Sequence, residues 1–346
     1  MNAHPVRLAV MGAGLIGRRH VEHILAEPIA ALHSIIDPSE DARAFAQNRG
    51  LRWHANLGSA LKDDRPDGLI IATPNAMHVE HGLAAIEAGL PLLVEKPLAT
   101  DIFGAEQLVS AAEKAGLPLA VGHHRRHNPL ILKAKQFIED GRLGRIISVH
   151  GFFWLIKPDD YYEIAWRREA GAGPILINLI HDIDLLRFLC GEITEVRAMR
   201  SSIVRNFPVE ETAVVLLRFA NGALGTFNVS DTIVAPWSWE HTSGENAAYP
   251  RTDENCYLIG GTEGSLTIPR LELWRNGSRR GWHEPFLNER HIAATPDPLR
   301  LQIVQFCRII RDGEAPLVPG REGLESLRVI EMIHRAALTD ETGKNA

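Results

Sequence analysis

The chain has 346 residues, of which 45% are apolar and 23% are charged, and this composition indicates about two folded domains and excludes wholesale disorder. Acidic residues outnumber basic ones by 43 to 37, so nothing in the net charge of -6 favours nucleic acid or an anionic membrane as a partner. No apolar run approaches the roughly 20 residues of a membrane span. Three widely spaced cysteines without metal-binding spacing are typical of a reducing compartment, and we expect a cytoplasmic protein.

Short apolar runs alternate with segments of helical periodicity in the first third of the chain, which is the pattern of a parallel sheet with crossover helices. The expected strands cover residues 6–11, 32–37, 68–73, 92–95 and 119–122, and the expected helices cover residues 16–27, 38–49, 78–88 and 102–115. Glycine or proline follows each of these helices, as is common at helix ends. We therefore expect a doubly wound α/β domain over residues 1–122.

The pattern changes after the last of these strands, because a helix expected at 129–140 is followed by strands that pair through hairpins. The clearest hairpin joins residues 212–219 to residues 223–229. Asn221-Gly222 lies between them and predicts a type I′ turn.

Two amphipathic helices, expected at 298–311 and 321–338, come last. Residues 123–346 are therefore expected to form a second α/β domain, and its C-terminal helices are candidates for packing back onto the first domain.

A dinucleotide fingerprint follows the first expected strand and opens the first expected helix. The motif is Gly12-Ala13-Gly14-Leu15-Ile16-Gly17. Its three glycines, in order, permit a tight turn, let backbone amides approach a pyrophosphate, and let the helix pack closely. Asp37 ends the second expected strand, where a carboxylate accepts both hydroxyls of an adenosine ribose and repels a 2′-phosphate. These residues predict that the cofactor is NAD rather than NADP, against the alternative of a glycine turn without a nucleotide.

Glu95-Lys96-Pro97 lies at the carboxyl end of the strand expected at 92–95, which is the edge where open α/β sheets bind ligands. A lysine beside a nicotinamide can hydrogen-bond a reacting hydroxyl or carbonyl oxygen as hydride moves. Considered alone, the motif leaves a solvated surface lysine as the alternative.

A helix expected to run to Leu189 carries Asn178, His181 and Asp184 on one face, because three-residue steps relate them. Leu179, Ile183 and Leu186 fall away from this face. A histidine can exchange a proton with a secondary alcohol when a neighbour fixes its tautomer, and Asn178 or Asp184 is the candidate neighbour. The alternative is a histidine in a hydrogen-bonded cluster on the helix surface.

Other polar clusters carry less weight. His123, His124 and His127 resemble metal ligands, but adjacent residues on a strand point to opposite faces and no cysteine or carboxylate joins them at zinc spacing. We expect no metal. The arginine pairs at 125–126 and 167–168 leave open a carboxylate-bearing substrate or surface ion pairs.

Taken together, the motifs resemble those of the Gfo/Idh/MocA oxidoreductases over nearly the whole chain. The resemblance is carried by the glycine turn, by Ala72-Thr73-Pro74-Asn75 with His78, by Glu95-Lys96-Pro97, by Gly122 with Arg125-Arg126, by residues 171–184 and by residues 320–323. It implies an N-terminal Rossmann dinucleotide-binding domain and a C-terminal α/β domain with an open, mostly antiparallel sheet. In the family that sheet forms one wall of the active site and often an oligomer interface.

The resemblance also implies residue roles. Lys96 and His181 match the family's catalytic residues. The positions that match cofactor neighbours are Thr73, Asn75, His78 and Glu95, and those that match the substrate pocket are His124, Arg125, Trp166 and Arg167. The chain departs from the family at Ile177, where many members carry an Asp four residues before the histidine. Asn178, one place later, can hold an imidazole but cannot stabilise imidazolium by charge, so either Asp184 substitutes or the base is weaker.

The main hypothesis is an NAD-dependent oxidoreductase that transfers hydride between the nicotinamide and a secondary hydroxyl of a sugar, cyclic polyol or related diol. An NAD-using glycosidase of the same fold and a non-catalytic nucleotide or ligand sensor are the alternatives. The expected partners are a small carbohydrate-like molecule and further copies of the chain, as a homodimer or homotetramer.

Overall fold

The computed structural model describes residues 4–169, 171–293 and 296–342, and the chain divides into two compact units. The first unit contains residues 1–127 and 297–327, and the second contains residues 128–296 and 328–346. Within the described ranges, no helix has the length and apolar character that crossing a membrane requires.

The first unit is a doubly wound α/β fold, as predicted. Its elements are β1 (Val6–Met11), α1 (Leu15–Ala26), β2 (Ala30–Ile36), α2 (Glu40–Gln47), β3 (Trp53–His54), α3 (Leu57–Asp63), β4 (Gly68–Ile71), η1 (Asn75–Met77), α4 (His78–Glu87), β5 (Leu92–Val94), α5 (Ile102–Ala115), β6 (Leu119–Val121), η2 (His124–His127) and α9 (Pro298–Asp312). The six parallel strands follow the order β3-β2-β1-β4-β5-β6, which is the strand order of a Rossmann fold.

The central strands of this sheet are apolar throughout because helices cover both of their faces. Every residue of β4, β5 and β6 is buried. α9 belongs to the same unit, and its residues Ile303 and Phe306 lie in one hydrophobic cluster with Leu8 of β1. β3 and α3 were not predicted, since a two-residue strand and a seven-residue helix are too short to establish a period.

The second unit is an eight-stranded sheet with helices packed on one face. Its elements are α6 (Pro129–Glu139), β7 (Ile146–Trp154), η3 (Asp159–Glu163), η4 (Ala165–Arg168), η5 (Ile175–Leu179), α7 (Ile180–Cys190), β8 (Ile193–Ser201), β9 (Thr212–Phe219), β10 (Leu224–Ser230), α8 (Trp239–Ser243), β11 (Tyr257–Gly261), β12 (Ser265–Ile268), β13 (Glu272–Asn276) and β14 (Phe286–Arg290), and α10 (Gly320–Thr342) continues into it from the first unit. The strand order is β14-β13-β12-β11-β7-β10-β9-β8, and every pair is antiparallel except β7 with β10. The predicted mostly antiparallel sheet is therefore confirmed.

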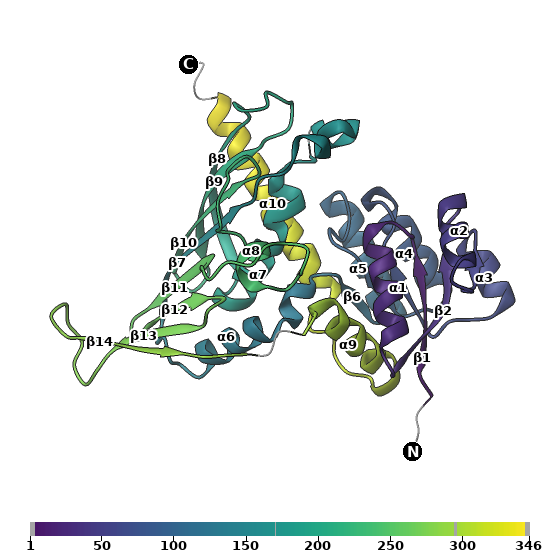
Figure 1. Cartoon of the computed structure of the whole chain (residues 1–346), viewed down its shortest axis with the longest axis horizontal. Coiled ribbons are helices and arrows are strands. Elements are labelled where there is room, and N and C mark those ends of the chain that lie inside the picture. The colour runs from purple at the N-terminus through teal and green to yellow at the C-terminus, as the bar shows by residue number, and fades with distance from the viewer. Residues whose placement is uncertain (1–3, 170, 294–295, 343–346) are drawn as a thin grey trace. The chain divides into compact units, whose positions relative to one another are not determined.

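The two faces of this sheet differ in what covers them. Alternate residues of β9, such as Val215 and Leu217, point into the core, which also contains side chains of α6, α7 and α10. In Figure 1 these three helices lie on the same side of the sheet, and the described residues place no helix on the opposite side. Val214 and Leu216 alternate with the core residues and point to that uncovered face.

The turn between β9 and β10 is not the type I′ turn that Asn221-Gly222 predicted. A type I′ turn needs positive φ at both central residues, but Gly222 has φ +87° and Asn221 is not among the residues with positive φ. The Asn221 side chain is engaged elsewhere: its Nδ2 donates to the carbonyl of Cys190 at 2.8 Å, and its Oδ1 accepts from Ala223 N–H at 3.0 Å. One bond to the end of α7 and one within the turn thus hold Asn221 in a turn with a single left-handed residue, Gly222.

Candidate functional site

The glycine-rich turn after β1 is shaped by close backbone contacts. At Gly17 a Cβ atom would lie 1.9 Å from the carbonyl oxygen of Gly12. At Gly12, where φ is +93°, it would lie 2.5 Å from the carbonyl oxygen of Ala72. At Gly14 an added Cβ meets no atom within 4 Å. Two of the glycines are thus required for packing, and the third leaves the backbone open to a ligand.

The N-terminus of α1 fits the phosphates of a dinucleotide. Gly14 precedes the helix and contributes no side-chain cap, and the first turn, which contains Leu15 and Ile16, has no acidic residue. The first N–H groups of a helix lack intrahelical partners and lie at its positive end, so they bind phosphate well. A bound nicotinamide dinucleotide would supply the hydride acceptor, and this turn would hold its pyrophosphate.

Asp37 follows β2 and faces the glycine-rich turn. Its carboxylate accepts hydrogen bonds from Ala13 N–H at 2.8 Å, from Ser39 N–H at 2.9 Å and from the Ser39 hydroxyl at 2.6 Å. Burial alone would raise the pKa of Asp37, but the bonds from Ser39 and then Ala13 outweigh it and lower that pKa below its ordinary value. A negative charge therefore stands beside the turn at neutral pH.

Thr73, Asn75 and His78 lie at the carboxyl end of β4, the strand beside β1 and β5. The His78 ring is completely buried, with Nε2 2.9 Å from the carbonyl oxygen of Thr73 and Nδ1 2.8 Å from that of Pro97. His78 thus connects the loops that follow β4 and β5. Asn75 opens the short turn η1 between them and is half-buried.

Glu95 follows β5 and is buried. Its Oε1 lies 2.7 Å from Nε2 of His20 in α1, and its Oε2 accepts from the backbone N–H of Lys96 at 3.2 Å. A Cβ at position 122 would lie 2.7 Å from Oε2, so Gly122 leaves the space that the carboxylate needs. Burial acts to raise the pKa of Glu95, but His20, with further contributions from His124 and Lys96, lowers it to about 2. The backbone N–H of Lys96 therefore donates to a buried, ionised carboxylate.

The segment after β6 turns sooner than predicted. His123 and His124 do not alternate along a strand, because β6 ends before them and η2 begins at His124. His124 is half-buried and Arg125 is buried. Among the residues that the structure describes, no group of three His, Cys, Asp or Glu side chains is placed to hold a metal ion.

In the second unit, a buried carboxylate fixes the start of the helical segment that carries His181. An added Cβ at Gly173 would lie 2.1 Å from Oε1 of Glu210, and the same oxygen accepts from Ile175 N–H at 3.2 Å. Burial raises the pKa of the Glu210 carboxyl. The glycine at position 173 is therefore needed for Glu210 to reach the helix end.

The helical segment is not the uniform α-helix that was predicted. Residues Ile175–Leu179 form a π-helix, and α7 begins at Ile180. The step from Asn178 to His181 therefore crosses a change of helix type, which three-residue spacing does not anticipate. His181 and Asp184 are buried and Asn178 is half-buried. The Oδ1 atom of Asn178 is itself buried and accepts no hydrogen bond from any described residue.

Asp182, beside His181, was not assigned a role from sequence. It is completely buried, and its Oδ1 accepts a hydrogen bond from the hydroxyl of Tyr257 in β11. This bond connects α7 to the sheet beneath it. Three residues predicted to turn away from the polar face lie in the hydrophobic core: Leu179, Ile183 and Leu186.

Trp166 and Arg167 lie on η4, in the loop after β7. Trp166 is 50% exposed. The Nη1 atom of Arg167 donates to the carbonyl of Tyr161 at 2.9 Å, and its guanidinium lies 4.0 Å from the centre of the Tyr161 ring. Arg167 is thus held by the loop and leaves Trp166 exposed beside it.

The strand order, the glycine-rich turn and the acidic residue after β2 define an oxidoreductase-type dinucleotide-binding fold. Residues 6–123 match the model of the oxidoreductase family with an NAD-binding Rossmann fold, and residues 131–267 match the GFO/IDH/MocA C-terminal domain. The chain belongs to the Gfo/Idh/MocA oxidoreductase family. The resemblance inferred from the motifs is confirmed.

Three similar proteins illustrate the match. The chain is 28% identical over 340 residues to scyllo-inositol 2-dehydrogenase (NAD(+)) of Bacillus subtilis, which covers 94% of this chain and 92% of that protein. It is 30% identical over 234 residues to inositol 2-dehydrogenase 2 of Saccharopolyspora erythraea, covering 63% of this chain and 65% of that one. The structure is similar to the WlbA dehydrogenase of Bordetella pertussis in complex with NADH and UDP-GlcNAcA, with 27% identity, a TM-score of 0.78, and coverage of 96% and 97%.

The contacts of the glycine-rich turn predict different effects for two alanine substitutions. Gly14→Ala should leave the free energy of unfolding unchanged or raise it by up to about 1 kcal/mol, because φ is -70° and the added Cβ meets nothing, yet it should weaken NAD binding at least about tenfold. Gly17→Ala should lower the free energy of unfolding by about 1–3 kcal/mol through overpacking. Urea unfolding measures the free energy of unfolding of each variant, and calorimetric titration measures its affinity for NAD. Parental NAD affinity in Gly14→Ala would contradict phosphate binding at this turn.

Proposed function

We propose that the protein oxidises a secondary hydroxyl of a sugar, cyclic polyol or related diol, with NAD as the hydride acceptor. The observation that carries the proposal is the common position of Asp37, Lys96 and the glycine-rich turn at the carboxyl edge of one parallel sheet. Ligands of open α/β sheets bind at that edge. The relatives named as inositol dehydrogenases support the class of substrate.

Lys96 and His181 are the residues to which we assign the proton chemistry. A neutral imidazole accepts the hydroxyl proton as the carbon is oxidised, and a lysine ammonium stabilises negative charge on the oxygen. Asn178 and Asp184 flank His181 along the helical segment and are assigned to orient its ring. The side chains assigned to contact the substrate are His124, Arg125, Trp166 and Arg167.

The reaction predicts NADH formation with at least one member of a panel of sugars, inositols and sugar acids. Its kcat/KM should rise with pH, because imidazolium cannot accept a proton. His181→Ala should lower kcat/KM by roughly 10² to 10⁴ and remove this pH dependence. Asn178→Asp should move the rise in kcat/KM to higher pH, since a carboxylate beside His181 favours its imidazolium form. His283→Ala, at an exposed histidine, is the control.

Two outcomes would overturn the proposal. Release of nitrophenol from a nitrophenyl glycoside without net NADH would indicate the glycosidase. A pH profile that stays the same in both His181→Ala and Asn178→Asp would show that another residue is the base.

The choice of cofactor follows from the charge of Asp37. NAD should bind at least about tenfold more tightly than NADP, a difference of about 1.4 kcal/mol, because the carboxylate repels a 2′-phosphate. Asp37→Ser should reduce the difference in affinity between NAD and NADP. Glu40→Ser, which removes an exposed carboxylate from the first turn of α2, should leave it unchanged. Calorimetric titration with both dinucleotides measures the difference, and equal affinities in the parent protein would refute the assignment.

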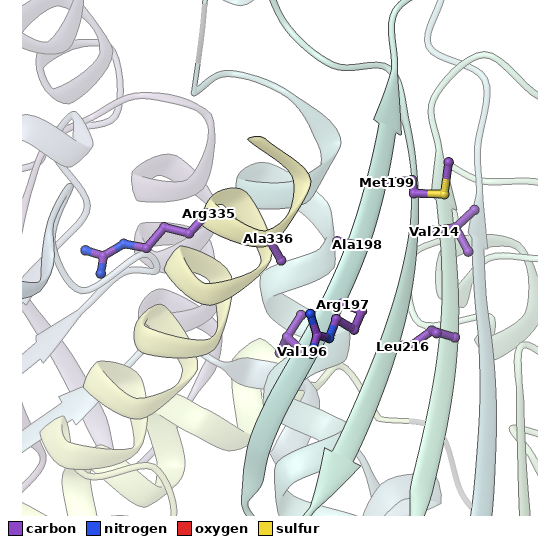
Figure 2. Close-up of a pocket in the computed structure, with 8 residues that line it drawn as sticks. All are labelled: Val196, Arg197, Ala198, Met199, Val214, Leu216, Arg335 and Ala336. Carbon is purple, nitrogen blue, oxygen red and sulfur yellow. The ribbon is translucent and has the colours of Figure 1, made fainter. Parts of the chain in front are cut away.

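We further propose that copies of the chain assemble through the uncovered face of the second sheet, as a homodimer or as part of a homotetramer. This face exposes apolar side chains from several neighbouring strands: Met199, Val214, Leu216, Leu224 and Leu258. At its edge, a hollow of about 680 Å³ runs from β8 and β9 to α10 (Figure 2). Monomers rarely leave an apolar surface of this extent in water.

Leu216→Glu is expected to shift the protein toward the monomer, because it places a charge among the exposed apolar side chains of this face. Phe103→Glu changes an even more exposed apolar residue on α5 and should leave the mass of the assembly unchanged. Sedimentation velocity over a range of concentrations measures the oligomeric state of the parent and of both variants. A parent protein that sediments as a monomer throughout would contradict the proposed assembly.

A further inference from the structure

We propose that His20 is a positioning residue for Lys96 and acts through the buried carboxylate of Glu95. The assignment rests on the proposed catalytic role of Lys96. His20 contributes no atom to the reaction. Its function is to hold the carboxylate to which the backbone of Lys96 is bonded.

His20 occupies a place where the helix pattern predicts an apolar side chain. The buried face of α1 consists of Gly17, His20, Val21 and Ile24, which follow helical spacing. The ring of His20 is 0% exposed. A buried polar ring costs free energy unless it is hydrogen-bonded, so its presence on this face needs a partner.

Glu95 is that partner. The Nε2 atom of His20 lies 2.7 Å from Oε1 of Glu95, whereas Nδ1 of His20 has no hydrogen-bond partner in the described part of the chain. The ring must therefore carry its proton on Nε2 to donate to the carboxylate. His20 thus joins α1 to the carboxylate at the end of β5.

The carboxylate of Glu95 is confined on its other side as well. Its Oε2 accepts from Lys96 N–H at 3.2 Å and lies against Gly122, where a Cβ would approach to 2.7 Å. The charge of Lys96 also acts on this carboxylate and helps to lower its pKa. Without His20, Oε1 of the buried carboxylate would lose its donor, and a carboxylate that shifts toward another donor would also move Lys96, whose N–H is bonded to Oε2.

The same helix provides a matched control. Nε2 of His23, one turn after His20, lies 3.2 Å from Oδ2 of Asp297. Burial acts to raise the pKa of Asp297, but His23, with further contributions from Leu299 N–H and Arg19, lowers it to about 2. Asp297 caps α9 by accepting from Leu299 N–H at 2.9 Å. The two pairs therefore share a helix, a residue type and an ionised carboxylate, but only the pair with Glu95 reaches Lys96.

The kinetic test compares His20→Leu, His20→Gln and His23→Leu with the parent. His20→Leu should lower kcat at least about tenfold and leave the KM for NAD within about threefold. The amide N–H of His20→Gln can donate to Glu95, so kcat should return to within about threefold of the parent. His23→Leu should lower the melting temperature without changing kcat. An equal loss of kcat in His20→Leu and His23→Leu, or no rescue by His20→Gln, would reduce His20 to a structural role.

A second readout requires no activity. The chain has seven lysines, so reductive methylation with ¹³C-formaldehyde gives few NMR resonances, and Lys96→Arg identifies that of Lys96. The resonance should shift in His20→Leu and stay in place in His23→Leu. If His20→Leu does not fold, His20→Asn, which is too short to reach Glu95, replaces it. A resonance that stays in place would refute the positioning role. A parent that forms no NADH while the resonance shifts would instead refute the proposed function alone.

Discussion

The buried negative charge of Glu95 is the constraint on which the geometry of the first unit depends. A carboxylate in the interior costs several kcal/mol unless donors surround it, and its partners come from separate elements. His20 belongs to α1, the Lys96 N–H belongs to the end of β5, and Gly122 supplies the space beside β6. One buried charge thereby fixes the helix of the glycine-rich turn to the strand end that carries the lysine. The position of Lys96 is set by the same contacts that hold the sheet and α1 together.

The second unit also uses buried carboxyl groups to hold a segment that carries proposed site residues. Glu210 and Asp182 are buried carboxylates that hold the helical segment around His181, the first at the N–H of Ile175 and the second at the hydroxyl of Tyr257. In each unit a glycine makes room for a carboxylate: Gly122 for Glu95 and Gly173 for Glu210. A larger residue at either glycine would push the carboxylate off its donors. Neither glycine is required for a tight turn. Each is needed because it leaves space for the neighbouring carboxylate.

Sequence patterns predicted the features that depend on local rules. The apolar strands, the glycine-rich turn and the position of Asp37 follow from burial, backbone space and strand order, and all appear where expected. The features that were missed depend on distant contacts. Glu210, distant in the sequence, accepts from the first residue of the π-helix before α7, and the Asn221 side chain donates to the carbonyl of Cys190. His20 left a weak signal, a polar residue on an apolar helix face, but its partner Glu95 is distant in the sequence.

The contrast between backbone and side chains explains why the cofactor class can be inferred from sequence more readily than the substrate. The dinucleotide cradle is made by the absence of side chains at Gly12, Gly14 and Gly17, and at Gly12 and Gly17 only glycine satisfies the contact distances. The groups proposed to meet the substrate are individual side chains on a helix with an irregular start, on the loop after β7 and on the short turn η2. Their directions depend on packing rather than on a motif. Cofactor binding and substrate choice therefore rest on separate sets of residues, and substitutions in one set can alter its specificity while the other set keeps its geometry.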